Sequence, residues 1–483
     1  MKAMRFPILV MLISILWSCG SEPKSEKDSL SNRISRIENG LQSNLQIQYK
    51  DSVIKSTYHI EERMRELRIP GVSIAVLNDG VVEWAKGYGM ADSTENRKVT
   101  TETLFQAGSI SKPVAATRAH QLVELGLLDL DEDVNTYLSS WQLPDNEFTT
   151  KEKVTLRRML NHTAGLTVWG FPGYAKGEDV PSIPNILDGQ GNTDSVRVYK
   201  EPGGDWQYSG GGYTIMQLMV TDIEQKPFPA IMFENVLKPL NMQSSTYENP
   251  LPEKYHGIAA AGYYADGTQV AGKWHTYPEM AAAGLWTTPS ELILWGKEIQ
   301  QILQTQKDGL LKAGTVNEML IPTKDQQGLG PFVMDLTFGH GGADEGFRAE
   351  LLVWKETANA IVIMVNSDNG STIMREIILS FVEEYDLPDY TPTKRVFEEQ
   401  SQAQLERFVG KYDFLDNGFA QVSIKDDGLA FDAKGFTEET VPLWPESDST
   451  FFSKNTGLRF NFTLEGGEVT GMKILSYEGT KVE

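Results

Sequence analysis

Residues 105–126 read FQAGSISKPVAATRAHQLVELG and place Ser109, Ser111 and Lys112 at the expected start of a long helix. Apolar residues recur at helical spacing, and a proline in the first turn is tolerated because its missing N–H would have no partner there. We therefore predict an amphipathic helix from about Ser109 to Glu124. A serine at this position is either an N-cap, which accepts a hydrogen bond from the first turn, or a nucleophile.

Ser109 and Lys112 have the spacing Ser-x-x-Lys, which puts both side chains on one face of a helix. There an ammonium can lie against a hydroxyl and relay its proton. The same spacing occurs at Ser21–Lys24 and Ser52–Lys55, so by itself it leaves the N-cap interpretation open. Ser109 differs because it follows a β-rich hairpin and opens a helix, whose N-terminal N–H groups can face a substrate. Ser111 lies about 100° around the helix from Lys112, so it is not the favoured nucleophile.

Composition describes a globular chain with an acidic surface. The 483 residues are too many for one ordinary core, so we expect a large domain and a smaller one. The formal net charge of −22 argues against binding nucleic acid or anionic lipid by charge.

The N-terminus reads as a targeting segment over residues 1–19. Residues 6–17, FPILVMLISILW, are apolar but far short of the ~20 residues that span a bilayer as a helix. They end at Ser18 and Cys19, the only cysteine, in a pattern that resembles a bacterial lipobox. Lipidation of Cys19 would make the protein an exported envelope lipoprotein, facing the periplasm or on the outer membrane. The alternative is an ordinary signal peptide with an incidental cysteine.

The rest of the chain divides by composition. Residues 20–45 are polar and lack aromatics, so we expect a disordered tether. The segments that follow predict, in order, a helix, strands, helices, strands and a helix, at 47–67, 72–89, 127–320, 329–366 and 371–385. This order gives one domain over 46–388, in which both ends build the sheet and a helical lobe is inserted between them.

A second, smaller domain is expected at the C-terminus. Residues 389–404 form a polar, proline-containing linker. Residues 405–483 alternate apolar and polar side chains around glycine-rich turns, as in LRFNFTLEGGEVTGMKIL. This pattern is typical of a small all-β barrel or sandwich.

Five segments in chain order carry the motifs of one family. They are GYGMADSTENRKVTTETLFQAGSISKPVAA, LRRMLNHTAGL, WQYSGGGYTIMQLMV, AAAGLWTTPSELILWGKEI and FGHGGADEGFRAELLVW. Together they resemble the serine β-lactamase and penicillin-binding-protein superfamily, closest to its class C β-lactamase, D-alanyl-D-alanine carboxypeptidase and esterase branch. The resemblance covers about Ile47 to Asp386. It implies an α/β (α+β) domain of the β-lactamase/transpeptidase type, with an antiparallel sheet flanked by helices.

The resemblance also assigns a catalytic set. Ser109 would be the acylated nucleophile, with Lys112 against it. Tyr208 would take the proton from Ser109 and later help water attack the acyl-enzyme. The backbone N–H groups of Ser109 and Ala343 would form the oxyanion hole.

Other positions would complete the site or support it. Gly341 and Gly342 would leave the strand edge open to substrate. His340 stands where many relatives have lysine and would donate a hydrogen bond to the substrate or to the network of Tyr208 and Lys112. His162 would be structural and hold the HTAGL loop.

Two departures from the family pattern concern substrate choice. Gly210 stands where relatives carry the asparagine of Tyr-x-Asn, so a polar substrate contact is lost. His340 in place of lysine gives up a permanent cation for a carboxylate. Both favour an esterase, a peptidase of unusual specificity or a weak penicillin binder over an efficient β-lactamase.

Other enzyme classes lack their motifs. No intact Gly-x-Ser-x-Gly occurs, and the six histidines are scattered, so neither an α/β-hydrolase nor a zinc hydrolase is favoured. We expect no metal or cofactor, a small-molecule or peptide substrate, a membrane contact through the lipid anchor, and no nucleic acid. The oligomeric state stays open. The alternative is a non-catalytic envelope lipoprotein that binds peptidoglycan fragments or β-lactams without turnover.

Overall fold

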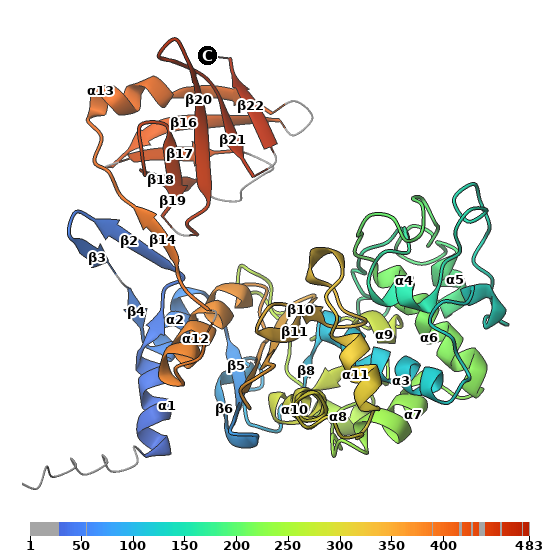
Figure 1. The fold of residues 1–483 in the computed structure, drawn as a ribbon. Helices are drawn as coiled ribbons and strands as arrows, with labels where there is room; N and C mark the ends of the chain where they lie inside the picture. Colours follow the sequence, from blue (N-terminus) through green and yellow to red (C-terminus); the bar gives the residue numbers. More distant parts are fainter. Residues whose placement is uncertain are drawn as a thin grey trace, which may run out of the picture.

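The computed structural model describes residues 29–54, 56–388, 390–414, 418–426, 428–433, 440–454, 456–475 and 477–482. Within this part of the chain, no helix combines the length and apolar character needed to cross a membrane. Cys19 and the expected signal peptide lie outside the described residues. Figure 1 shows a large domain with a helical lobe and a C-terminal barrel set apart from that lobe.

The large domain is built on a seven-stranded antiparallel sheet in the order β10-β11-β12-β13-β5-β6-β7. The strands are β5 (Gly71–Asn78), β6 (Val81–Asp92), β7 (Arg97–Lys98), β10 (Phe332–Val333), β11 (Thr337–Asp344), β12 (Phe347–Trp354) and β13 (Ala360–Val365). The β5–β6 hairpin turns at Asp79-Gly80, and β13 pairs with β5 through Ile363 opposite Ile74. The prediction that both ends of the domain build one sheet is therefore confirmed.

Each face of the sheet is covered by helices because apolar side chains alternate along the buried strands. On one face, Ile74 packs in a core with α12 (Gly370–Glu384), α2 (Ile60–Glu66) and α1 (Leu30–Asn39). On the other face, Ala75 packs in the main core with α10 (Pro289–Thr305).

The inserted lobe consists of short helices and long loops. Its helices are η2 (Val134–Thr136), α4 (Leu156–Leu160), α5 (Ile183–Leu187), α6 (Gly210–Glu224), α7 (Phe228–Met232), the π-helical turn η3 (Phe233–Leu237), α8 (Glu253–His256), α9 (Met280–Ala283), α11 (Ala313–Met319) and η4 (Lys324–Gln326). The two-stranded pair β8 (Phe105–Gln106) and β9 (Trp286–Thr287) lies at its base.

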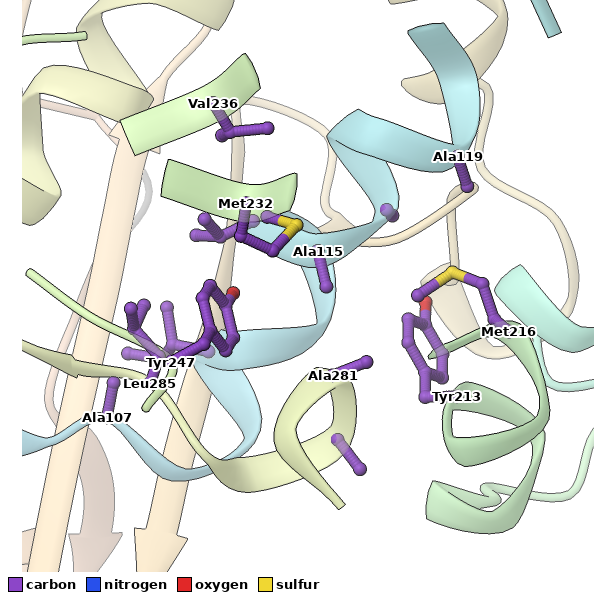
Figure 2. Close-up of a cluster of buried hydrophobic side chains, with 14 of the residues drawn as sticks. Ala107, Ala115, Ala119, Tyr213, Met216, Met232, Val236, Tyr247, Ala281 and Leu285 are labelled. Atoms are coloured by element: carbon purple, nitrogen blue, oxygen red, sulfur yellow. The ribbon is translucent and has the colours of Figure 1, made fainter. Parts of the chain in front are cut away.

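The helix predicted at 109–124 is observed with a tighter start. Residues Gly108–Ile110 form the 3₁₀ turn η1, and α3 runs from Ser111 to Glu124. The helix is buried on nearly all sides, whereas we expected one exposed face. Figure 2 shows the reason: alanines such as Ala115 and Ala119 let α3 pack closely between neighbouring segments of the lobe.

The N-terminal predictions were wrong in part. Residues 30–39, expected in a tether, form α1, in which Ile37 is buried and Arg36 pairs with Glu384 of α12. The helix expected over 47–67 is instead the three short strands β2 (Leu45–Tyr49), β3 (Ser52–Ile54) and β4 (Thr57–Tyr58), followed by α2. The sequence Leu-Gln-Ile-Gln-Tyr has the two-residue period of a strand, which the charges around it obscured.

The predicted linker is also partly ordered. Its residues Thr393–Val396 form β14, which pairs in parallel with β2. The N-terminal segment and the linker therefore make one small sheet, β14-β2-β3, next to the barrel.

The C-terminal domain is an eight-stranded closed barrel, as the alternating pattern predicted. Its strands are β15 (Gly410–Asp413), β16 (Phe419–Lys425), β17 (Gly428–Asp432), β18 (Val441–Pro445), β19 (Thr450–Ser453), β20 (Arg459–Glu465), β21 (Glu468–Ile474) and β22 (Tyr477–Lys481). Each strand pairs with the next in sequence, and β22 closes the barrel on β15. The short helix α13 (Gln402–Leu405) and the 3₁₀ turn η5 (Glu406–Phe408) lead into it.

Candidate active site

Ser109 lies in η1, where the chain passes from β8 into the buried helix α3. Its side chain is half-buried, and Lys112 one turn later is only 2% exposed. Lys112 Nζ donates hydrogen bonds to Ser109 Oγ at 2.9 Å and to Ala282 O of α9 at 2.8 Å. The i, i+3 spacing therefore brings the hydroxyl and the ammonium together, and the Ser109 hydroxyl hydrogen is left free to point elsewhere.

Ser111 has a different environment, although it is only two residues away. It is fully buried, its Oγ donates to Gly108 O at 2.6 Å, and it accepts from Leu285 N at 2.9 Å. Its hydroxyl ties η1 to the strand segment beside it. This position fits the expectation that Ser111 is not the nucleophile.

Tyr208 comes from the loop before α6 and packs beside Lys112. Lys112 Nζ lies 4.9 Å from the centroid of the Tyr208 ring. On another side, the His162 ring packs on the Tyr208 ring with a centroid distance of 4.3 Å. The lysine and the tyrosine are 96 positions apart, so this juxtaposition depends on the packing of the lobe against α3.

His162 positions the Tyr208 segment. Its Nδ1 accepts a hydrogen bond from Ser209 N at 3.1 Å, and the residue has the left-handed φ of 60°. Burial, with the charge of Lys112 as the second cause, holds the pKa of His162 well below its usual value, so the ring is neutral. We predicted a structural role for His162 within its own loop, and the contacts extend that role to Tyr208.

Gly210 begins α6 directly below an aromatic ring. A Cβ atom at this position would lie 3.0 Å from Phe171 Cε2 and 3.1 Å from Trp169 O. The space that a side chain would need is therefore already occupied by Phe171 and the loop backbone. We expected Gly210 to line the substrate site, whereas it is buried under this loop.

His340 is buried on β11 and faces the same group of side chains. Its Nδ1 is hydrogen-bonded to Gly341 O, a carbonyl that can only accept, so Nδ1 carries the hydrogen. Burial, and next the charge of Lys112, lower the pKa of His340 to about 3, so the ring is neutral. Its Nε2 is buried without a partner among the described residues and carries a lone pair. We expected His340 to donate a hydrogen bond to the substrate or to the network of Tyr208 and Lys112, whereas in this tautomer the free nitrogen is an acceptor.

The proposed oxyanion donors come from two backbones in direct contact. A Cβ on Gly108, which has φ of 52°, would lie 2.4 Å from Ala343 N. A Cβ on Gly342 would lie 1.9 Å from Ala107 O. Only glycine at both positions lets η1 and β11 approach this closely, and the proposed pairing of the Ser109 and Ala343 N–H groups requires that approach.

This contact changes the interpretation of the glycines. We expected Gly342 to leave room for substrate, but its absent side chain faces the Ala107 backbone. Gly341 differs, because a Cβ there would meet Glu350 Oε2 at 3.3 Å. Gly108 was missed by the sequence analysis, although a glycine directly before a candidate nucleophile on a turn is a usable signal.

Two buried carboxyl groups lie near the site. Asp344, at the end of β11, is buried, and burial raises the pKa of its carboxyl group well above its usual range. Glu279 precedes α9, is fully buried, and has no hydrogen-bond partner for either carboxyl oxygen among the described residues. Burial raises the pKa of Glu279 to about 7. In the part of the chain that the structure describes, no group of three or more histidine, cysteine, aspartate or glutamate side chains could hold a metal ion.

The Glu279→Gln variant is expected to gain stability over the wild type as pH rises. The folded-state pKa of about 7 lies above the ordinary value of 4.5, so ionisation above pH 4.5 favours the unfolded chain. The free energy of unfolding of the wild type therefore falls by roughly 3 kcal/mol between pH 4.5 and pH 8. The variant does not show this decrease, because glutamine does not ionise. Urea unfolding at both pH values measures the difference, with Glu102→Gln at an exposed position as the control. A difference between variant and wild type that is the same at both pH values would contradict this.

Sequence models of known families match both domains of the chain. Residues 58–378 match the sequence model of the Beta-lactamase family, and residues 394–483 match a domain of unknown function, DUF3471. Penicillin-binding protein 4* of Bacillus subtilis (strain 168) is 21% identical over 437 residues, covering 84% of this chain and 92% of that protein.

Solved structures share the fold. The octameric penicillin-binding protein homologue from Pyrococcus abyssi superposes with a TM-score of 0.60 at 20% identity, covering 87% of this chain and 98% of that one. FmtA from Staphylococcus aureus superposes with a TM-score of 0.55 at 18% identity, covering 70% of this chain and 91% of that one.

Proposed function

The chain belongs to the Beta-lactamase family, and from this premise we propose that it is a serine hydrolase working through an acyl-enzyme on Ser109. The observation that carries the proposal is the 2.9 Å hydrogen bond from Lys112 Nζ to Ser109 Oγ, at the start of a buried helix and beside Tyr208. A protein that only binds a ligand has no need of a hydroxyl held against a buried ammonium. The bond cleaved is an ester, an amide or a D-amino-acid peptide bond.

We assign Tyr208 as the group that takes the proton of Ser109. An ammonium has no lone pair, so a charged Lys112 stabilises negative charge on its neighbours but takes no proton. In the proposed first step Tyr208 enters as its phenolate. The Oγ–H bond of Ser109 breaks, the phenolate oxygen takes the proton, and Oγ bonds to the substrate carbonyl carbon as the C=O π bond opens to the oxyanion. The oxyanion that forms accepts hydrogen bonds from the N–H groups of Ser109 and Ala343.

In the second step the proton transfer is reversed. Tyr208 returns the proton to the leaving oxygen or nitrogen as its bond to the acyl carbon breaks, which leaves acyl-Ser109. A water molecule next gives a proton to Tyr208 and bonds to the acyl carbon. The Ser109 oxygen leaves and takes that proton back, which releases the acid and restores the enzyme.

Within this reaction class, we favour esters whose leaving group carries no free carboxylate. In relatives a lysine at the position of His340 supplies a cation for that carboxylate, whereas the buried His340 is neutral above a pKa of about 3. The lone pair of its free Nε2 would face the lone pairs of a substrate carboxylate and could not pair with its charge. An unpaired carboxylate charge is costly in a site shielded from water.

A matched pair of substrates tests this preference. A depsipeptide ending in D-lactate and its methyl ester share the acyl group and the leaving oxygen but differ by one negative charge. We expect kcat/KM to be higher for the methyl ester by about tenfold or more. The His340→Gln variant, which stays neutral, should keep the preference, and His340→Lys should reduce or reverse it. A wild-type enzyme that prefers the free carboxylate would contradict the assignment.

The second candidate is a covalent binder without turnover, which the missing asparagine amide at Gly210 permits. It would form an adduct on Ser109 with a fluorescent β-lactam and hydrolyse neither ester.

We also propose that Cys19 is lipidated and that the protein resides in the cell envelope. The mass of the mature N-terminal peptide, isolated from the producing cell, tests that proposal.

A further inference from the structure

The two ends of the C-terminal barrel are built differently. One end is filled, because Phe408 of η5 enters it and is fully buried. The Phe408 ring packs against Phe451 at 4.9 Å and against Phe462 at 4.8 Å between centroids. Tyr412 OH donates to Phe408 O at 2.7 Å and fixes this plug to the first strand.

The other end of the barrel is hollow. It holds a cavity of about 350 Å³, lined by residues where β17 and β21 end and where β18, β20 and β22 begin. The apolar lining comes chiefly from Phe414, Phe431, Val441, Leu458, Phe460 and Ile474. Leu475, on the rim, is 67% exposed, so the apolar lining continues to the surface.

Size and architecture fit a bound small molecule. Eight-stranded barrels are just wide enough to be filled by side chains or to hold one small ligand. In this barrel, side chains fill the end that holds Phe408, and the end that holds Phe431 has room for a small ligand. A volume of about 350 Å³ lies at the low end of small-molecule pockets, and the lining is predominantly apolar and aromatic as in such pockets.

The lining also specifies the charge of the ligand. The polar side chains among the lining residues are those of Ser453, Thr456 and Tyr477, all hydroxyl-bearing. No described lining residue is an acid, lysine, arginine or histidine that could pair with an ion. Because an unpaired charge is costly to bury, the cavity selects uncharged ligands whose polar end can reach a hydroxyl.

We propose that the C-terminal barrel binds one uncharged, apolar small molecule in this cavity, of the class of a medium-length alkyl chain with a neutral hydroxyl or ester head. The chain would lie against Phe431 and Phe460, and the head would lie near Ser453 and Thr456. This site is separate from the Ser109 hydrolase site and does not depend on its activity.

The test uses the full chain and the uncharged fluorescent probe N-phenyl-1-naphthylamine, with two competitors of ten carbons at pH 8. We expect the probe fluorescence to saturate and 1-decanol to displace the probe. Decanoate should displace it only at concentrations about tenfold higher or more. Equal displacement by the two competitors would overturn the choice of an uncharged ligand. The absence of saturable binding would overturn the site itself.

Variants place the binding in the barrel. Val441→Trp and Ile474→Trp each put an indole into the cavity, and each is expected to weaken probe binding about tenfold or more. Val482→Trp is the matched control, because Val482 is 49% exposed and lies outside the lining. Circular dichroism and the midpoint of urea unfolding show whether each variant is folded.

The outcomes separate this site from the catalytic one. Ser109→Ala should bind the probe as the wild type does, whether or not the proposed hydrolase activity exists. If both cavity-filling variants fold and bind the probe with wild-type affinity, the probe binds elsewhere and the proposal fails. If only Val482→Trp loses affinity, the cavity is likewise excluded.

Discussion

Replacing Ser109 with alanine is expected to abolish ester hydrolysis and β-lactam acylation together, with kcat falling by on the order of 10⁴ or more. The loss is this large because the covalent bond to the acyl carbon has no other candidate oxygen. Ser111, two residues away, is fully buried with its hydroxyl engaged on both sides. Turnover of a p-nitrophenyl ester measures the rate, and intact-protein mass spectrometry after incubation with a fluorescent β-lactam measures the adduct.

Ser111→Ala is the matched control for this prediction. It removes the hydrogen bonds to Gly108 O and from Leu285 N. Leu285 N is left unpaired, whereas Gly108 O keeps the backbone N–H of residue 111. We expect it to lower the free energy of unfolding by about 1–3 kcal/mol while the adduct still forms on Ser109. An adduct that survives in Ser109→Ala and disappears in Ser111→Ala would show that the nucleophile is misassigned.

Replacing Gly342 with alanine is expected to reduce kcat by about 10²–10³ while the protein stays folded. The added Cβ would stand 1.9 Å from Ala107 O, so β11 and η1 must move apart. That movement separates the N–H of Ala343 from the N–H of Ser109 and removes one oxyanion donor. The decrease should fall mainly on kcat, because the oxyanion forms in the transition state and not in the bound substrate.

The neighbouring variant Gly341→Ala isolates the effect of the contact from the effect of an added methyl group. A Cβ at Gly341 would meet Glu350 Oε2 at 3.3 Å, a side-chain atom that can shift by a few tenths of an ångström. We expect a much smaller loss of kcat than for Gly342→Ala. Comparable losses at the two positions would show that the close approach to Ala107 does not shape the site.

The local patterns of the sequence were sufficient for several elements. The Asn-Asp-Gly turn predicted the β5–β6 hairpin, and alternation predicted the barrel strands, because both signals act within a few residues. The i, i+3 spacing of Ser109 and Lys112 predicted their contact for the same reason. The same logic failed for residues 47–58, where charged neighbours hid the two-residue period of β2, and for α3, whose burial on all sides depends on what packs around it.

The sequence alone determined which residue types were available at Ser109, Lys112 and Tyr208, and which segments could form strands or helices. Only the tertiary structure decided that Lys112 lies beside Tyr208, that Gly342 contacts Ala107, and that His340 is neutral with its free nitrogen in the site. The physical reason is that spacing along a chain fixes directions only within one element. Distances between elements, and the burial that sets the protonation of a histidine, follow from how the lobe, the helix and the sheet pack together.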